Sequence, residues 1–243
     1  MMGPALRAPG WEEIPDLVHA FLGRPGLPSS DPSIARPSDP LCDVKKSLGL
    51  AGHKITTLTQ VHGDTILDVE EPRKSAGEGD ALASDRPGVL LGVLTADCVP
   101  VLLVDPDRRV CAAVHAGWRG TAARIASKAV GHLAARYGCD SEWLLAAIGP
   151  AIGACCFEVG PEVVAQFREA WGEEFEPFYK ARGEKGTIDL RGLNRLSLLE
   201  AGIPEDRISL VGPCVFCAPA DFHSYRRDGA KAGRQVSLVG FLS

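Results

Sequence analysis

The sequence predicts a layered α+β fold in which helices flank a mixed β-sheet core. Two observations lead to this class. Short apolar runs bounded by turn residues predict strands, and they do not alternate strictly with the segments that predict helices. Spacings of hairpin length dominate around residues 88–115, which favours a mixed sheet over a doubly wound one.

The expected strands follow a proline-rich loop. Residues 25–40, PGLPSSDPSIARPSDP, contain five prolines and four serines, a composition typical of a loop. Residues 54–70 contain two β-rich pieces separated by a turn at residues 62–64. Residues 88–94 and 99–104 are continuous apolar runs, as in strands that are buried on both faces.

Helical periodicity appears in the second half of the chain. Over residues 121–137 the apolar side chains recur every three to four positions, which predicts one helix. The other expected elements are helices over 161–171 and 191–202 and strands over 144–149, 207–212 and 234–243. We expect residues 1–243 to form one domain, because single domains of this size built around large sheets are common. No internal repeat of fixed period is present.

Composition and charge narrow the classes of function. The net charge is -5, and no cluster of five Lys or Arg residues offers a phosphate backbone a binding surface, so we expect no nucleic-acid partner. No apolar run is long enough to cross a membrane and no signal-peptide pattern is present, so we expect a cytoplasmic protein. In that compartment the eight cysteines are expected as thiols or metal ligands rather than disulfides.

Three segments place a metal-binding side chain where an apolar strand ends or is interrupted. They are TQVHGD with His62, TADCVP with Cys98, and AVHAGWRG with His115. One thiolate and two imidazoles form a tetrahedral zinc set, and three protein ligands leave the fourth position open, as in catalytic zinc sites. The same residues also allow a Cys-His hydrolase without a metal, in which Cys98 is the nucleophile and a histidine is the base.

A second cysteine motif is PCVFC at residues 213–217. PCxxC is half of the zinc-deaminase signature, whose other half is HxE or CxE, and only Cys156-Phe157-Glu158 fits, far upstream. A single CxxC without a second pair also falls short of a zinc ribbon. We therefore expect two packed thiols near a strand end. Nucleotide-binding GxGxxG and GxxxxGK[ST] motifs and the hydrolase GxSxG motif are absent from the sequence.

Taken together, several motifs resemble the laccase-domain, or YfiH-like, family from about residue 50 to the C-terminus. They are TQVHGD, GDALAS, TADCVPVLL, HAGWRG, AIGPAIGACCFEVGPEV, DLRGLNRLSLLEAGI and DFHSYRRDG. The resemblance implies a layered α/β fold and one metal, usually zinc, held by His62, Cys98 and His115. It implies phosphorolysis of adenosine, inosine, guanosine and methylthioadenosine, and deamination of adenosine.

Two further activities are attributed to members of this family. One is copper-dependent oxidation of phenols, and the other is removal of a wrongly added amino acid from a peptidoglycan precursor. A multinuclear copper cluster is disfavoured here because the chain has two methionines and no HxH pairs. The chain departs from the family mainly before residue 50, where the proline-rich segment replaces the usual loop.

We expect zinc as the cofactor, with copper as the alternative, and a purine nucleoside and phosphate as substrates. Arg119 and Arg226 are expected to bind an incoming phosphate or to stabilise a developing negative charge, because guanidinium groups match phosphate oxygens. Gln60 is expected to contact the substrate. Asp80 or Asp97 is expected to orient a ligand histidine or to move a proton. The sequence leaves the oligomeric state open.

Overall fold

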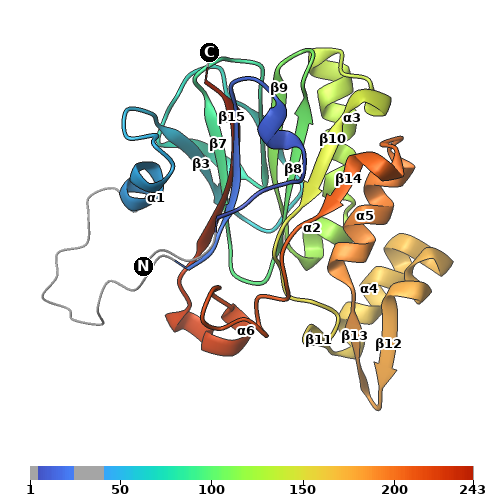
Figure 1. Cartoon of the computed structure of the whole chain (residues 1–243). Helices are drawn as coiled ribbons and strands as arrows, with labels where there is room; N and C mark the ends of the chain where they lie inside the picture. Colours follow the sequence, from blue (N-terminus) through green and yellow to red (C-terminus); the bar gives the residue numbers. More distant parts are fainter. Residues whose placement is uncertain (1–4, 25–40, 243) are drawn as a thin grey trace, which may run out of the picture.

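Two six-stranded β-sheets pack face to face, and helices cover their outer sides. The computed structural model describes residues 5–24 and 41–242, so the proline-rich segment 25–40 lies outside the described residues. Figure 1 shows the layers in order, with α1 (Cys42–Ser47) beside one sheet and α3 (Ile125–Tyr137) beside the other. This arrangement confirms the predicted layered α+β class.

The first sheet joins strands from both ends of the chain. Its order is β1 (Ala5–Leu6), β2 (Leu17–Leu22), β15 (Gln235–Phe241), β7 (Leu90–Thr95), β3 (Ile55–Gln60) and β5 (Ser75–Gly79). The pairs of β15 with β2 and β7 are antiparallel, whereas β3 pairs in parallel with β7 and β5. The sheet is therefore mixed, as predicted.

The second sheet contains the most apolar strands of the chain. Its order is β14 (Ile208–Leu210), β10 (Leu145–Ile148), β8 (Val99–Asp105), β9 (Val110–Ala116), β6 (Ala81–Ser84) and β4 (Ile66–Asp68). Every residue of β8 and β9 is buried, because one face meets the first sheet and the other meets helices. This double burial accounts for the continuous apolar runs in the sequence.

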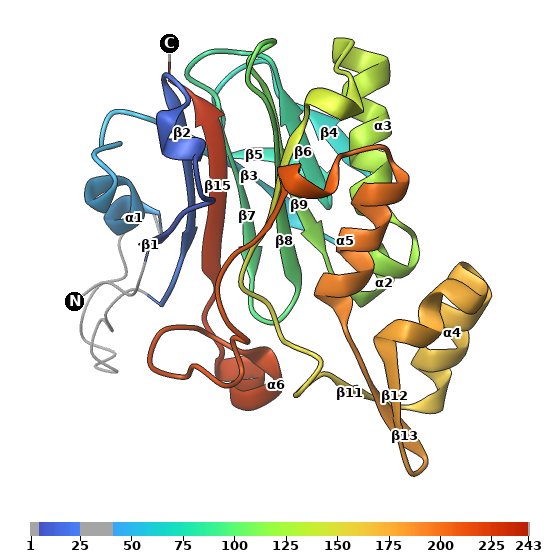
Figure 2. The ribbon, with the colours of Figure 1, turned by 45° about the vertical axis from the view of Figure 1, so that its right-hand side comes forward.

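The helices on the outer face of the second sheet share one hydrophobic core with it. They are α2 (Trp118–Ala122), α3, α4 (Pro161–Trp171) and α5 (Leu190–Glu200). Figure 2 shows α4 at one end of the molecule, next to a small sheet of β11 (Glu158–Val159), β13 (Lys185–Ile188) and β12 (Tyr179–Arg182). Helix α6 (Tyr225–Asp228) follows a long loop after β14. The 3₁₀ helices are Trp11–Glu13, Ser141–Trp143, Gly172–Phe178, Glu205–Arg207 and Gly229–Lys231.

The helix predicted over residues 121–137 is wrong in its first turn. Helix α2 begins earlier, at Trp118, and α3 begins only after Arg124, whose φ of 57° is left-handed and interrupts the helix. The Arg124 guanidinium lies over the Trp171 ring at 3.8 Å and forms ion pairs with Glu174 and Glu200. These tertiary contacts stabilise a backbone conformation that local periodicity does not reveal.

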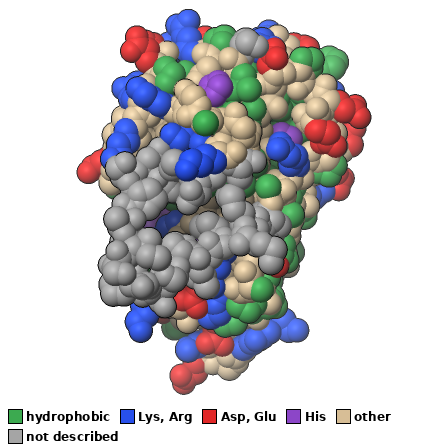
Figure 3. Space-filling view, turned by 60° about the vertical axis from the view of Figure 1, so that its left-hand side comes forward, with side chains coloured by type: hydrophobic (Ala, Val, Ile, Leu, Met, Phe, Trp, Pro, Cys, Tyr) green, Lys and Arg blue, Asp and Glu red, His purple; other side chains and the backbone are tan. Residues whose placement is uncertain are grey.

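On the face in Figure 3, Lys and Arg side chains are interspersed with Asp and Glu. Among residues 5–24 and 41–242, no helix combines the length and the apolar character needed to cross a membrane.

Three short connections carry the chain from the first sheet to the second. They join β3 to β4, β5 to β6, and β7 to β8. The short spacing between the apolar runs 88–94 and 99–104 is therefore a crossing between sheets and not a hairpin within one sheet. Residues 61–65, 80 and 96–98 form these connections, which contain His62, Asp80 and Cys98 of the candidate site.

Candidate metal centre

The three predicted ligands come together where the chain crosses between the sheets. His62 follows β3, Cys98 precedes β8, and His115 lies in β9, where it pairs with Pro100 of β8. The metal-binding atoms of His62, Cys98 and His115 all lie within 4.8 Å of one another. The two imidazole rings meet edge to face, with their centroids 4.9 Å apart. One thiolate and two imidazoles that converge in this way fit a single zinc ion.

Asp80 holds both histidines in place from a fully buried position. Its Oδ1 lies 2.8 Å from Nδ1 of His115 and accepts the backbone N–H of His62 at 2.9 Å. Its Oδ2 accepts the backbone N–H of Gly63 at 2.6 Å. Burial raises the pKa of Asp80, but the hydrogen bonds from His115, Gly63 and His62 together lower this pKa by more than burial raises it. The net shift of the pKa is therefore downward. The ionised carboxylate therefore fixes the proton on Nδ1 and leaves Nε2 of His115 for a metal.

The thiol and the imidazole of the site influence each other's charge. Burial raises the pKa of Cys98, but hydrogen bonds with His115 and His62 outweigh burial and lower that pKa to about 7. Burial lowers the pKa of His115, whereas its hydrogen bonds with Asp80 and Cys98 raise it to about 9. The site therefore favours a thiolate beside a protonated imidazole, and a bound cation would replace the imidazole proton.

Two glycines in HAGWRG allow this close approach. A Cβ on Gly117 would lie 3.0 Å from Cδ2 of His62 and 3.4 Å from Sγ of Cys98. A Cβ on Gly120 would lie 2.9 Å from the carbonyl oxygen of Gly63. Any larger residue at position 117 would therefore press on the ligand set.

Asp97 occupies a strained position next to Cys98. Its φ of 95° is rare for a residue with a side chain and requires support from its surroundings. Its Oδ2 accepts the backbone N–H of Arg226 at 2.6 Å, and its carbonyl oxygen accepts the N–H of Ile152 at 2.9 Å. Its Oδ1 is buried and has no hydrogen-bond partner among the described residues. One carboxylate oxygen beside Cys98 is therefore left without a hydrogen-bond partner among the described residues.

A pocket of about 690 Å³ opens over the three ligands. This volume lies within the range of small-molecule sites. Aromatic side chains of Trp118, Phe157 and Tyr225 line it together with the guanidinium groups of Arg119 and Arg226. The pocket thus combines apolar planar surfaces with positive charge beside the candidate metal centre.

The predicted substrate-binding residues all line this pocket, but their side chains differ in availability. The amide of Gln60 donates to the carbonyl oxygen of Leu94 and accepts its N–H, both at 2.8 Å, which ties β3 to β7. Arg226 donates from Nη1 to the carbonyl oxygen of Glu158 at 2.6 Å. The guanidinium of Arg119 lies over the ring of Trp118 at 4.2 Å, and it forms no hydrogen bond or ion pair with the described residues. Arg119 is therefore the most available of the three.

Sequence reasoning missed part of the pocket wall. Four lining residues belong to none of the metal-binding motifs. They are Ile152, Phe157, Tyr225 and Arg234. The segments AIGACCFEVG and DFHSYRRDG, which carry the family resemblance, contain the first three of these residues. Arg234 immediately precedes β15 and belongs to no motif that signals a site.

Comparison with known proteins identifies the family. The model of the family described as "Multi-copper polyphenol oxidoreductase laccase" matches residues 41–242. The chain belongs to this laccase-domain family. The resemblance of the sequence motifs is thereby confirmed, and His62, Cys98 and His115 all fall within the matched range.

Members of the laccase-domain family with named activities are similar over much of the chain. A purine nucleoside phosphorylase from Deinococcus radiodurans is 38% identical, and the match covers 98% of this chain and 92% of that protein. An adenosine deaminase, RL5, from an unknown prokaryotic organism is 42% identical, over 71% of this chain and 66% of that protein. These names place activity on purine nucleosides in the family.

Solved structures of the laccase-domain family share the whole fold. YlmD from Geobacillus stearothermophilus is 30% identical with a TM-score of 0.87, covering 99% of this chain and 97% of that one. The hypothetical protein YfiH from Bacillus licheniformis is 28% identical with a TM-score of 0.85, covering 98% of this chain and 97% of that one. The layered architecture is therefore that of the family.

Proposed function

We propose that this protein is a zinc-dependent purine nucleoside enzyme. Its reactions are phosphorolysis of adenosine, inosine, guanosine and methylthioadenosine, together with deamination of adenosine. The observation that carries the proposal is the convergence of His62, Cys98 and His115, within 4.8 Å of one another, on the pocket lined by aromatic and arginine side chains. The names of the relatives, purine nucleoside phosphorylase and adenosine deaminase, support the substrate class.

The donor set favours zinc. A soft thiolate with two imidazoles suits zinc, and three protein ligands leave room for a substrate atom. A bound zinc ion would supply Lewis-acid chemistry to the substrate. The chain's own contribution is rigidity, because Asp80 fixes the histidines and Gly117 leaves space for the ligands.

The pocket walls suit a purine and an anion. A purine ring is flat and largely apolar on its faces, and the side chains of Trp118, Phe157 and Tyr225 offer it aromatic surfaces. Arg119 offers its N–H groups to phosphate, since stacking on Trp118 leaves the edge of the guanidinium free. We assign Arg226 a supporting role at the same anion, because one of its N–H groups already contacts the backbone of Glu158.

Phosphorolysis requires one proton to be moved. A phosphate oxygen forms a bond to C1′ of the ribose, the bond from C1′ to the purine breaks, and the base leaves with the electron pair and takes up the proton that hydrogen phosphate gives up. Asp97 is the candidate group for this transfer, because its Oδ1 faces no partner among the described residues. Asp80 is not, because hydrogen bonds engage both of its oxygens.

An assay with and without phosphate tests the proposal. Wild-type protein is incubated with inosine or adenosine, and free base and inosine are quantified by chromatography alongside zinc analysis. We expect phosphate-dependent release of hypoxanthine from inosine, and in Cys98→Ala the loss of activity and of the zinc ion bound by His62, Cys98 and His115. The matched control is Cys139→Ser, which replaces a buried thiol outside the pocket.

Three outcomes would contradict it. Activity that survives complete removal of zinc would favour the Cys-His hydrolase, which uses the same residues without a metal. Turnover of a phenol only after copper is added would favour an oxidase. Binding of nucleosides without turnover, unchanged in Cys98→Ala, would favour a binding protein.

A further inference from the structure

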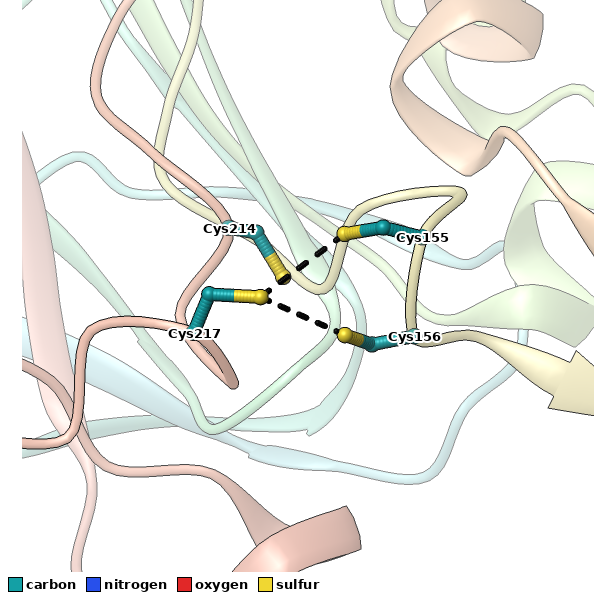
Figure 4. Close-up of side chains that lie close together, drawn as sticks. All are labelled: Cys155, Cys156, Cys214 and Cys217. Atoms are coloured by element: carbon teal, nitrogen blue, oxygen red, sulfur yellow. Dashed lines mark hydrogen bonds between the residues drawn. The ribbon is translucent and has the colours of Figure 1, made fainter.

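Four cysteines outside the pocket converge on one point. Cys155 and Cys156 lie in the turn before β11, and Cys214 and Cys217 lie in the loop between β14 and α6. Their four sulfur atoms lie within 4.8 Å of one another, and Figure 4 shows all four side chains turned toward a common centre. The expectation of two packed thiols at residues 213–217 is therefore incomplete, because a second pair of cysteines faces the first.

The separations between the sulfur atoms match ligation of one ion. Sγ of Cys217 lies 3.8 Å from Sγ of Cys155 and 3.4 Å from Sγ of Cys156. Zn–S bonds of about 2.3 Å in a tetrahedron place neighbouring sulfur atoms about 3.8 Å apart. A disulfide requires a separation of about 2.0 Å and would join only two of the four sulfurs. An iron–sulfur cluster would hold its cysteines farther apart, because several irons lie between them.

The backbone around the cluster is arranged as it is around metal thiolates. The N–H of Gly153 donates to Sγ of Cys214 at 3.1 Å. A Cβ on Gly153 would lie 3.2 Å from Cβ of Cys214 and 3.3 Å from Sγ of Cys155. Donors of this kind stabilise a charged sulfur, and the glycine allows the loop to approach it.

Simple packing does not explain the cluster. Cys155 and Cys217 are exposed and Cys156 and Cys214 are only partly buried, so little apolar surface is removed from water. Two loops far apart in sequence nevertheless direct all their thiols at each other. Among the cysteines whose side chains the structure describes, Cys111 and Cys139 are buried and show the ordinary role of a thiol in the core.

We infer that Cys155, Cys156, Cys214 and Cys217 bind one zinc ion in a closed, tetrahedral site that is separate from the His62, Cys98 and His115 centre. Binding replaces the four thiol protons, so one Zn²⁺ enters and up to four protons leave. Because all four positions belong to the protein, the site has no place for substrate and is structural.

The location of this zinc site indicates that it holds two walls of the pocket together. The loop with Cys155 and Cys156 carries Ile152 and Phe157, which line one wall of the pocket. The loop with Cys214 and Cys217 leads to α6, whose Arg226 lines the pocket and bonds to the backbone of Glu158. A zinc ion between the loops fastens these two walls together near the pocket.

Zinc stoichiometry tests the inference on the full chain. We expect Cys214→Ser/Cys217→Ser to bind one zinc ion fewer per chain than wild type, and His62→Ala/Cys98→Ala to lose the other. Cys139→Ser is the control and keeps the wild-type zinc content. Cobalt in place of zinc gives strong sulfur-to-cobalt absorption, which we expect to survive in His62→Ala/Cys98→Ala and to fall severalfold in the serine pair. A wild-type zinc content in the serine pair would overturn the inference.

A second measurement on wild-type protein covers the case in which the serine pair fails to fold. Alkylation by N-ethylmaleimide is followed by mass spectrometry, with zinc bound and after chelation. We expect Cys155 and Cys217, though exposed, to react at least tenfold more slowly with zinc bound. Equal rates under both conditions, or a disulfide among the four cysteines in freshly reduced protein, would contradict the inference.

Discussion

The buried carboxylate of Asp80 lies 2.8 Å from Nδ1 of His115 and directs the other nitrogen of that imidazole toward Cys98 and His62. The same oxygen accepts the backbone N–H of His62, whose φ of 62° is left-handed. Asp80 thus fixes the imidazole of His115 and the strained backbone of His62, and both histidines belong to the candidate ligand set.

Replacement of Asp80 tests this positioning role. In Asp80→Asn we expect zinc affinity at the His62, Cys98 and His115 centre to fall by about 10- to 100-fold, because the amide cannot accept every hydrogen bond that the carboxylate accepts. Competition with a chelator measures the affinity, and thermal unfolding is followed in parallel. Asp85→Asn, which alters an exposed aspartate, is the control. A lower melting temperature with unchanged zinc affinity would limit Asp80 to a structural role.

A single methyl group at position 117 is expected to disturb the ligands. Gly117→Ala places a Cβ 3.0 Å from the His62 ring, so we expect severalfold weaker zinc binding with the fold retained. The matched control is Gly131→Ala, in the exposed part of α3, where a Cβ meets nothing within 4 Å. That control should stabilise the protein by about 0.5 to 1 kcal/mol. Wild-type zinc affinity in Gly117→Ala would contradict this expectation and show that the ligand side chains can shift to make room for the added methyl group.

Arg119 should act on phosphate and not on the nucleoside. In Arg119→Gln we expect the KM for phosphate in phosphorolysis to rise by about tenfold, since a charge-assisted hydrogen bond is lost. Adenosine deamination uses no phosphate, so its kcat/KM should stay within about twofold. Arg86→Gln, outside the pocket, serves as the control. Equal losses in both reactions would assign Arg119 to the nucleoside instead.

His19 should make stability depend on pH. Burial and the nearby Arg7 charge lower the pKa of His19 to about 4, and its Nε2 accepts the backbone N–H of Ala8 at 3.0 Å. Below pH 6.5, the ordinary pKa of a histidine, His19 is protonated in the unfolded chain but stays neutral in the folded chain. The contribution of His19 to the free energy of unfolding is therefore complete above pH 6.5. It declines by on the order of 2 kcal/mol as the pH falls toward 4.

Urea unfolding at pH 7 and pH 4.5 measures this loss in wild type and His19→Gln. The variant keeps an acceptor for the N–H of Ala8 but cannot be protonated, so its stability should change less between the two values. An equally large loss in the variant would place the pH dependence in other groups.

Local patterns in the sequence predicted much of the fold and the candidate ligands. The apolar runs 88–94 and 99–104 predicted the buried strands β7 and β8, and the helix predicted over 161–171 is α4. TADC and HAGWRG drew attention to Cys98 and His115, because polar residues and glycines interrupt apolar strands there. Such signals are local, so they can be read from a few neighbouring residues.

What the sequence did not predict depends on contacts between distant segments. The division into two sheets arises from crossings such as the one between β7 and β8, whose length equally suits a hairpin. Asp80 and Asp97 seemed equivalent until the hydrogen bonds distinguished a positioning carboxylate from one with a free oxygen. Likewise, Cys155 and Cys156 face Cys214 only because two remote loops meet.

Phosphate-dependent release of hypoxanthine from inosine, measured on metal-depleted protein before and after addition of zinc, tests the central claim most directly. We expect no release without metal, restored release with zinc, and none with zinc in His62→Ala/Cys98→Ala. Full release by the metal-depleted wild type, or restoration in the variant that lacks both ligands, would contradict a zinc-dependent nucleoside reaction at His62, Cys98 and His115.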